Sequence, residues 1–138
     1  MKAHDVMTRD VKVTHPDQPI QEAARLMAEN DVGALPVGEG DQLIGMITDR
    51  DLAVRALAAG KGPQTLVREA MTAAIKYCFE DEDTDEVARN MGYIQIRRLP
   101  VVNHEKQLVG IISLRDLADT PESLGSAGEA LSGISHHS

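Results

Sequence analysis

Two short segments of the chain carry a hydroxyl group three residues after a glycine and three residues before a carboxylate. They read Gly45-x-x-Thr48-x-x-Asp51 and Gly110-x-x-Ser113-x-x-Asp116. A hydroxyl at the start of a helix can contact a phosphate that the free helix amides also bind, and a carboxylate one turn later can accept two hydrogen bonds from the cis hydroxyls of a ribose. The glycine would let a ligand approach the strand backbone closely. The pattern therefore indicates capture of a nucleotide.

The same pattern has a second interpretation that involves no ligand. A Ser or Thr at the N-cap with an acidic residue three positions later resembles a capping box, in which both side chains bond backbone amides at the helix start. An acidic residue in the first turn also interacts favourably with the helix dipole. The two interpretations are compatible, because a capping hydroxyl can turn from its own amide to a ligand oxygen.

The elements that must position these residues occur twice in the chain. Met7-Thr8 recurs 64 residues later as Met71-Thr72, and Leu35-Pro36-Val37 recurs as Leu99-Pro100-Val101. After one extra residue in the following loop, residues 43–52 align with residues 108–117. Loops absorb such single insertions at little cost, as duplicated units do when they diverge. The chain is therefore an internal duplication.

The residue pattern of each copy predicts five elements in the order strand, helix, strand, strand, helix. In the first copy the pattern predicts a short strand around Val11 and Val13, a helix over 20–30, a strand at 34–37, a turn at 38–41, a strand over 43–47, and a helix from Thr48 that carries Leu52, Ala53 and Leu57. The fold class is α/β of the α+β kind, with two pseudo-symmetric β-α-β-β-α repeats packed through their sheets, since one thin sheet has little core of its own. We assign residues 1–62 to the first repeat, 63–119 to the second, and 120–138 to a mobile C-terminal tail.

Composition excludes several classes of protein. The 138 residues include 14 basic and 22 acidic side chains, a net charge of −8, which argues against nucleic acid as a partner. No apolar run is long enough to span a membrane, and the polar start of the chain does not resemble a secretory signal. The single cysteine, Cys78, fits a reducing cytoplasm. We expect a cytoplasmic protein without a membrane partner.

The segments Asp5-Val6-Met7-Thr8, Gly33-Ala34-Leu35-Pro36-Val37 and 45–52, each with a second copy, resemble a tandem pair of CBS domains, also called a Bateman module. The match spans residues 5–118 and is most similar to small stand-alone bacterial proteins made of one CBS pair. The resemblance implies two clefts between the repeats that bind AMP, ADP, ATP, NAD or S-adenosylmethionine. It carries the ribose and phosphate contacts over to Thr48 and Asp51 in one site and to Ser113 and Asp116 in the other.

The resemblance also implies where the adenine lies. The first-strand segments 11–14 and 75–78, together with Ala34 and its counterpart, would supply backbone amides and carbonyls for the adenine edge, so the site includes Val13, Thr14, Ala34, Tyr77 and Cys78. Tyr77 could stack on the base, although a lone Tyr at a strand position is more often a core residue with its hydroxyl in water. Cys78 aligns with Thr14 and is expected to be a buried, unreactive thiol.

The two copies differ where a phosphate would lie. Arg97 and Arg98 precede the Leu-Pro-Val segment of the second copy, whereas Gly33 and Ala34 hold the aligned positions of the first. Family members often place basic residues there, and guanidinium groups are good phosphate ligands. The alternative is a solvated pair of charges. We expect the Ser113 site to bind the charged nucleotide more tightly.

The function that follows is a non-catalytic sensor of adenine nucleotides, which signals by conformational change to an unidentified protein target. We find no histidine spacing typical of a metal site and no set of residues typical of nucleophilic or acid–base catalysis, so we expect no metal, no catalytic cofactor and no enzyme activity. Apolar faces on the helices after Thr48 and Ser113 predict a homodimer. The main alternative is a ligand-free structural or partner-binding dimer in which the two motifs serve only as helix caps.

Overall fold

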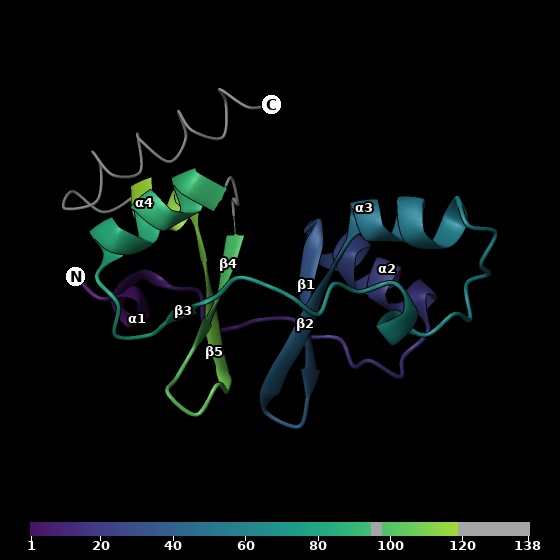
Figure 1. Ribbon diagram of the computed structural model, residues 1–138, viewed down its shortest axis with the longest axis horizontal. Helices are drawn as coiled ribbons and strands as arrows, with labels where there is room; N and C mark the ends of the chain where they lie inside the picture. The colour runs from purple at the N-terminus through teal and green to yellow at the C-terminus, as the bar shows by residue number, and fades with distance from the viewer. Residues whose placement is uncertain (95–97, 119–138) are drawn as a thin grey trace. The chain divides into compact units, whose positions relative to one another are not determined.

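The computed structural model describes residues 1–94 and 98–118, and the chain divides into two compact units (Figure 1). One unit is formed by Lys12–Ile75 and contains Thr48, so we call it the Thr48 unit. The other is formed by Met1–Val11 together with residues 76 onward and contains Ser113, so we call it the Ser113 unit. Each unit has its own hydrophobic core and is described by itself.

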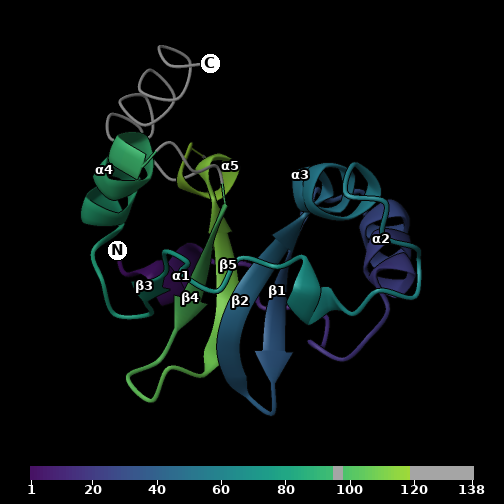
Figure 2. The ribbon, with the colours of Figure 1, turned by 45° about the vertical axis from the view of Figure 1, so that its right-hand side comes forward.

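The Thr48 unit is built on a hairpin of two antiparallel strands with helices against it (Figure 2). Its elements in chain order are α2 (Ile20–Asn30), β1 (Ala34–Glu39), β2 (Gln42–Thr48), α3 (Asp49–Asp51), the π-helical segment η1 (Leu52–Leu57) and the 3-10 turn η2 (Val67–Glu69). Gly40, with a φ of 63°, forms the tight turn between β1 and β2. Because β2 ends at Thr48 and α3 begins at Asp49, the helix starts directly at the end of the strand.

The Ser113 unit repeats this design with one more strand. Its elements are α1 (Ala3–Val6), β3 (Cys78–Phe79), α4 (Thr84–Ile94), β4 (Arg98–Val102), β5 (Leu108–Ser113) and α5 (Leu114–Ala118). The strand order is β3-β4-β5, in which β3 runs parallel and β5 antiparallel to β4. This mixture of helices and small sheets is the α+β two-repeat fold that the duplication predicts.

Local sequence explains the two longer helices. Apolar residues at helical spacing bury one face of α2, namely Ile20, Ala23 and Met27. The helix ends at Asp31, which adopts the left-handed conformation and donates its amide to the Met27 carbonyl. The aligned positions of α4 include Val87 and Met91, which are fully buried in the core of the Ser113 unit. The prediction of a helix over 20–30 is confirmed.

The segment that precedes each repeat packs on the sheet of the other repeat. Thr72 and Met46 exchange two backbone hydrogen bonds of 2.8 and 2.9 Å in the Thr48 unit, and Thr8 and Ile111 exchange the same pair in the Ser113 unit. Residues 1–11 and 65–75, which are equivalent in the duplication, are thus exchanged between the two repeats, because each segment joins the unit that contains the sheet of the other repeat. The two compact units therefore differ from the two sequence repeats, 1–62 and 63–119, because each unit combines parts of both repeats.

This exchange explains the two motif glycines. A methyl group added at Gly45 would lie 2.7 Å from the Thr72 carbonyl oxygen, and one added at Gly110 would lie 2.5 Å from Met7 Sδ and 2.9 Å from the Thr8 oxygen. The close approach is made by the chain itself, by the Thr72 backbone at Gly45 and by the Met7 side chain and the Thr8 backbone at Gly110. On the side where a methyl group would stand, the space beside both glycines is therefore already filled by the chain itself.

Two further expectations need correction. The strand predicted around Val11 and Val13 is absent, and only Thr14 forms a bridge, to Val37. In the helix after Thr48 the buried residue is Ala56, whereas Ala53 is exposed and Leu57 is 75% exposed, since η1 adds a residue to the turn and rotates the inward face. The predicted tail, 120–138, lies outside the described residues. No helix within the described ranges combines the length and the apolar character needed to cross a membrane.

Candidate functional site

Both motifs close reciprocal hydrogen bonds at the start of a helix. In the Thr48 unit the Asp51 amide donates to Thr48 Oγ1 and the Thr48 amide donates to Asp51 Oδ2, each at 3.0 Å. In the Ser113 unit the equivalent distances are 3.1 Å to Ser113 Oγ and 2.9 Å to Asp116 Oδ2. All four side chains are half-buried. The capping interpretation is therefore correct for both motifs, and the reciprocal hydrogen bonds fix the hydroxyl and the carboxylate of each motif in the same relative geometry.

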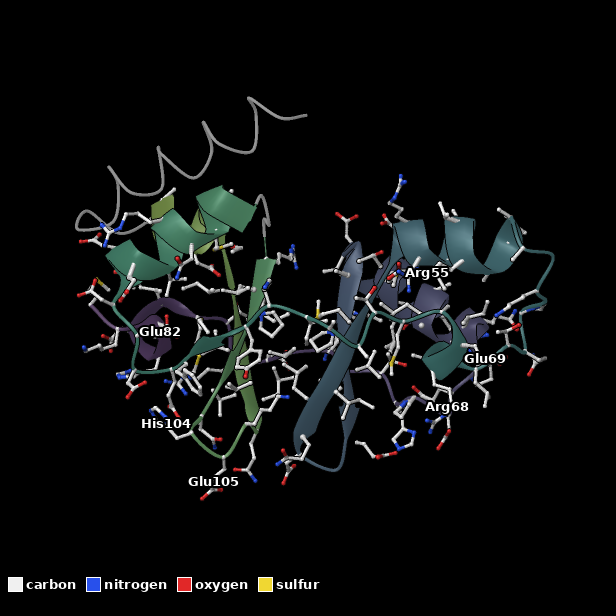
Figure 3. All side chains as sticks on the ribbon, in the orientation of Figure 1. Arg55, Arg68, Glu69, Glu82, His104 and Glu105 are labelled. Atoms are coloured by element: carbon white, nitrogen blue, oxygen red, sulfur yellow. The ribbon has the colours of Figure 1, made fainter. Side chains whose placement is uncertain are left out.

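The caps leave the second oxygen of each carboxylate for other partners. Asp51 Oδ1 lies 3.6 Å from Arg55 Nε, and Arg55 also donates to the Met71 carbonyl at 3.2 Å (Figure 3). In the part of the Ser113 unit that the structure describes, Asp116 Oδ1 has no such partner. A ribose that binds Asp51 must share this carboxylate with a guanidinium, whereas one that binds Asp116 meets no described competitor.

The sheet register sets what lies beside each hydroxyl residue. Ala34 is the partner of Thr48 across the β1–β2 ladder, and Arg98 is the partner of Ser113 across the β4–β5 ladder. Arg98 is exposed and forms no ion pair with any residue of the described ranges. Arg97 lies outside the described residues. The structure thus brings one of the two predicted arginines next to the Ser113 motif and a small apolar residue next to the Thr48 motif.

The residues predicted to meet adenine fall into two groups. Thr14 is 1% exposed, and its amide and carbonyl already bond to Pro36 and Gly38 in the sheet. Cys78 holds the equivalent place as the partner of Val101. Val13 is 41% exposed, and neither Val13 nor Tyr77 makes a backbone hydrogen bond with another described residue. The backbone groups that remain available to a base edge are therefore those of Val13 and Tyr77.

The side chains of the second first-strand segment have roles of their own. Tyr77 is 36% exposed, so it is not a core residue. Its ring packs edge-on against Phe79, with Lys106 Nζ 5.5 Å from the ring centroid. Burial raises the pKa of the Cys78 thiol to about 12, with a further contribution from the charge of Glu82. The expectation that the Cys78 thiol is buried is confirmed, since the residue is 2% exposed.

The structure also gathers residues that the sequence analysis did not connect. Ligand atoms of His15, Asp17 and Glu39 lie within 4.8 Å of one another. However, Arg68 Nε already donates to Asp17 Oδ1 at 2.8 Å, and the Asp17 amide donates to His15 Nδ1 at 3.1 Å. A cation would have to displace this guanidinium, so the cluster is an exposed ion-pair network. Its members come from a loop, a strand end and η2, which no sequence spacing reveals.

Comparisons with known proteins agree with this geometry. The family model for the CBS domain matches residues 3–57 and 67–122. The chain is 46% identical over 132 residues to the CBS domain-containing protein YhcV of Bacillus subtilis, covering 96% of this chain and 94% of that protein.

Solved structures give the same answer. The crystal structure of Hypoxic Response Protein I with two coordinated zinc ions has a TM-score of 0.79 and 36% identity, and the match covers 88% of this chain and all of that one. The CBS domain pair of protein MJ0100, in complex with 5-methylthioadenosine and S-adenosyl-L-methionine, has a TM-score of 0.74 and 29% identity, with coverage of 86% and 93%. The chain belongs to the CBS-domain family and carries two copies of the domain.

Proposed function

We propose that this CBS pair is a non-catalytic sensor that binds adenosine compounds at its two hydroxyl–carboxylate motifs. The observation that carries the proposal is the matched geometry of the two motifs, Thr48 with Asp51 and Ser113 with Asp116, each on the end of a strand. A carboxylate accepts both cis hydroxyls of a ribose at once. The complex of the related MJ0100 pair with two adenosine derivatives supports this class of ligand.

The surroundings of the Ser113 motif support a phosphorylated ligand there. Arg98 stands opposite Ser113 in the sheet and has no acidic partner among the described residues, and a guanidinium binds phosphate through two parallel donors. The free backbone groups of Tyr77 are suited to the edge of a base. AMP, ADP, ATP and NAD all combine a ribose, a phosphate and an adenine base. We therefore propose that the Ser113 site binds one of these compounds.

The test is titration calorimetry and thermal unfolding of the whole chain with AMP, ATP, NAD and S-adenosylmethionine. A ligand present at about 100 times its Kd adds about 2.7 kcal/mol of stability, which raises the Tm by several degrees. Asp116→Asn and Asp51→Asn keep an oxygen that can cap the helix but lose the charged acceptor. We expect each variant to retain the Tm of the free protein and to lose at least about tenfold in affinity at its own site.

A second function is favoured by one observation. In both motifs the hydroxyl and the carboxylate complete a helix cap, which is what a structural or partner-binding module would require. If that alternative is correct, millimolar concentrations of the four compounds will not change the Tm. The wild type and the two Asn variants will then also show no difference in calorimetry. Native mass spectrometry of freshly purified protein adds a direct readout, because it reports the mass of any retained ligand.

The signalling part of the proposal concerns a cytoplasmic homodimer that passes the ligand state to a protein target. The exposed apolar side chains of η1, Val54 at 51% and Leu57 at 75%, support pairing with a second copy. A ligand shifts such an assembly only as far as its affinities for two arrangements differ. We expect Leu57→Glu to reduce the mass measured by light scattering to that of one chain, with Ala58→Glu on the same helix end as the matched control.

A further inference from the structure

The residue after the motif hydroxyl differs between the two repeats. In the Ser113 unit this residue is Leu114, which is 6% exposed and belongs to the hydrophobic core. In the Thr48 unit the aligned residue is Asp49, which is exposed. A buried leucine and an exposed carboxylate give the two sites a different charge next to the hydroxyl.

The carboxylate of Asp49 is held in a defined place. Its Oδ1 accepts the amide of Arg50 at 2.8 Å, and its own amide donates to the Gly33 carbonyl at 2.9 Å. Asp49 Oδ2 lies against Gly33, 3.0 Å from where a methyl group on that residue would stand. Gly33 aligns with Arg97 in the duplication. A negative charge therefore lies against Gly33 in the Thr48 unit, whereas the residue aligned with Gly33 in the sequence of the other repeat is an arginine.

The remaining charges do not cancel this difference. Arg50 has an equivalent in Arg115, so it does not distinguish the two sites. Arg55 is engaged by Asp51 and by the Met71 carbonyl. The contrast in the described residues is thus Asp49 and Ala34 beside Thr48, against Leu114 and Arg98 beside Ser113.

We propose that the Thr48 site selects an adenosine compound whose 5′ substituent is neutral or cationic, and that Asp49 is the residue that rejects a phosphate there. This inference rests on the proposed function of the same site and adds the charge of its ligand. A like charge a few ångströms from a phosphate near a protein surface weakens binding by a factor of about ten or more, and it favours a cation by a similar factor. The two repeats then report on two chemically different adenosine compounds.

The test uses three compounds that share base and sugar and differ only in charge, namely adenosine, AMP and 5′-amino-5′-deoxyadenosine. Each is titrated into the isotopically labelled whole chain, and the backbone amide resonances of Thr48 and Asp51 are followed separately from those of Ser113 and Asp116. At the Thr48 amides we expect the neutral and cationic compounds to bind at least about tenfold more tightly than AMP. At the Ser113 amides we expect AMP to bind most tightly.

The decisive variant is Asp49→Asn, which removes the charge and keeps an oxygen for the Arg50 amide. We expect it to raise the affinity of the Thr48 site for AMP by about tenfold and to leave the affinity for adenosine unchanged. Adding Ala34→Arg, which copies Arg98, raises the affinity for AMP further. Asp41→Asn is the matched control, because it makes the same change of charge in the turn at the far end of β2, about 20 Å along the strand from Thr48.

The possible failures are distinguishable. If the Thr48 amides respond to AMP and adenosine with equal affinity, or if Asp49→Asn leaves their ratio unchanged, the charge selection by Asp49 is wrong while the sensor function stands. If the Ser113 amides respond and the Thr48 amides respond to none of the three compounds, the inference is likewise overturned. If no amide of either motif shifts at millimolar concentration, the proposed function itself fails.

Discussion

The amide of Asp51 donates to Thr48 Oγ1 while the amide of Thr48 donates back to Asp51 Oδ2, each over 3.0 Å. One pair of side chains thus closes the start of a helix and presents the hydroxyl and the outer carboxylate oxygen that we propose for ligand binding. Stability and recognition are coupled at these two residues, so variants must separate the two effects.

Replacement of Thr48 by Ala removes the cap and should lower the free energy of unfolding by about 1 kcal/mol. Thr48→Ser keeps the hydroxyl and should be close to neutral. Equilibrium urea denaturation without ligand measures both. Thr8→Ala is the control, because Thr8 is exposed and its hydroxyl caps no described helix. An equal loss for Thr8→Ala and Thr48→Ala would contradict the capping role.

Replacement of Gly45 by Ala should destabilise the protein by about 1–3 kcal/mol. The added methyl group would lie 2.7 Å from the Thr72 oxygen, which is backbone and cannot move without breaking its bonds to Met46. Gly62→Ala is the matched control, since a methyl group there meets nothing within 4 Å. Urea denaturation of both variants is the measurement. A Gly45→Ala protein as stable as the control would contradict the explanation that the added methyl group clashes with the Thr72 backbone.

Replacement of Arg98 by Ala should weaken AMP binding at the Ser113 site by about tenfold, because a charged partner of the phosphate is lost. Arg89→Ala on the exposed face of α4 removes the same charge and should leave the affinity unchanged. Titration calorimetry with AMP compares the two variants. Unchanged affinity in Arg98→Ala would show that this arginine is a solvated charge.

Cys78 should be protected from thiol reagents in the folded protein. The thiol is 2% exposed, and burial raises its pKa to about 12, so almost none is ionised at pH 8. We expect iodoacetamide to modify less than a tenth of the protein within minutes at pH 8, and all of it in denaturant. Mass spectrometry measures the modified fraction, and rapid stoichiometric labelling of the native protein would contradict the assignment.

The pKa of His104 should lie above the ordinary value for a histidine. Its Nε2 lies 2.8 Å from Asp81 Oδ2, and this hydrogen bond raises the pKa of His104 above 6.5 and lowers the pKa of Asp81 below 3.8. The histidine's contribution to stability is full below pH 6.5 and is lost as the pH rises through its folded pKa. The carboxylate's contribution is present above pH 3.8 and is lost as the pH falls through its folded pKa.

The measurement is an NMR titration of the His104 ring protons. Asp81→Asn should return the pKa of His104 towards 6.5, whereas Glu105→Gln, next to the histidine in the same turn (Figure 3), should change it much less. An identical titration curve in wild type and Asp81→Asn would disprove the contact in solution.

The sequence by itself determined the duplication, the fold class, the longer helix of the first repeat and both helix caps. These features depend on residues within one turn of each other, such as Thr48 and Asp51, or on apolar spacing along one helix, such as Ile20 to Met27. The register of Arg98 with Ser113 also follows from a local hairpin, so the predicted difference between the repeats was accessible from the pattern alone.

Only the tertiary structure decided which segments complete each sheet. The exchange of residues 1–11 and 65–75 explains the close packing at Gly45 and Gly110. It pairs residues that are far apart in the chain, Thr72 with Met46 and Thr8 with Ile111. The contact of Asp49 with Gly33 is likewise fixed by strand pairing across a loop. Local propensity carries no information on such pairings, because their free energy depends on which distant surfaces are buried together.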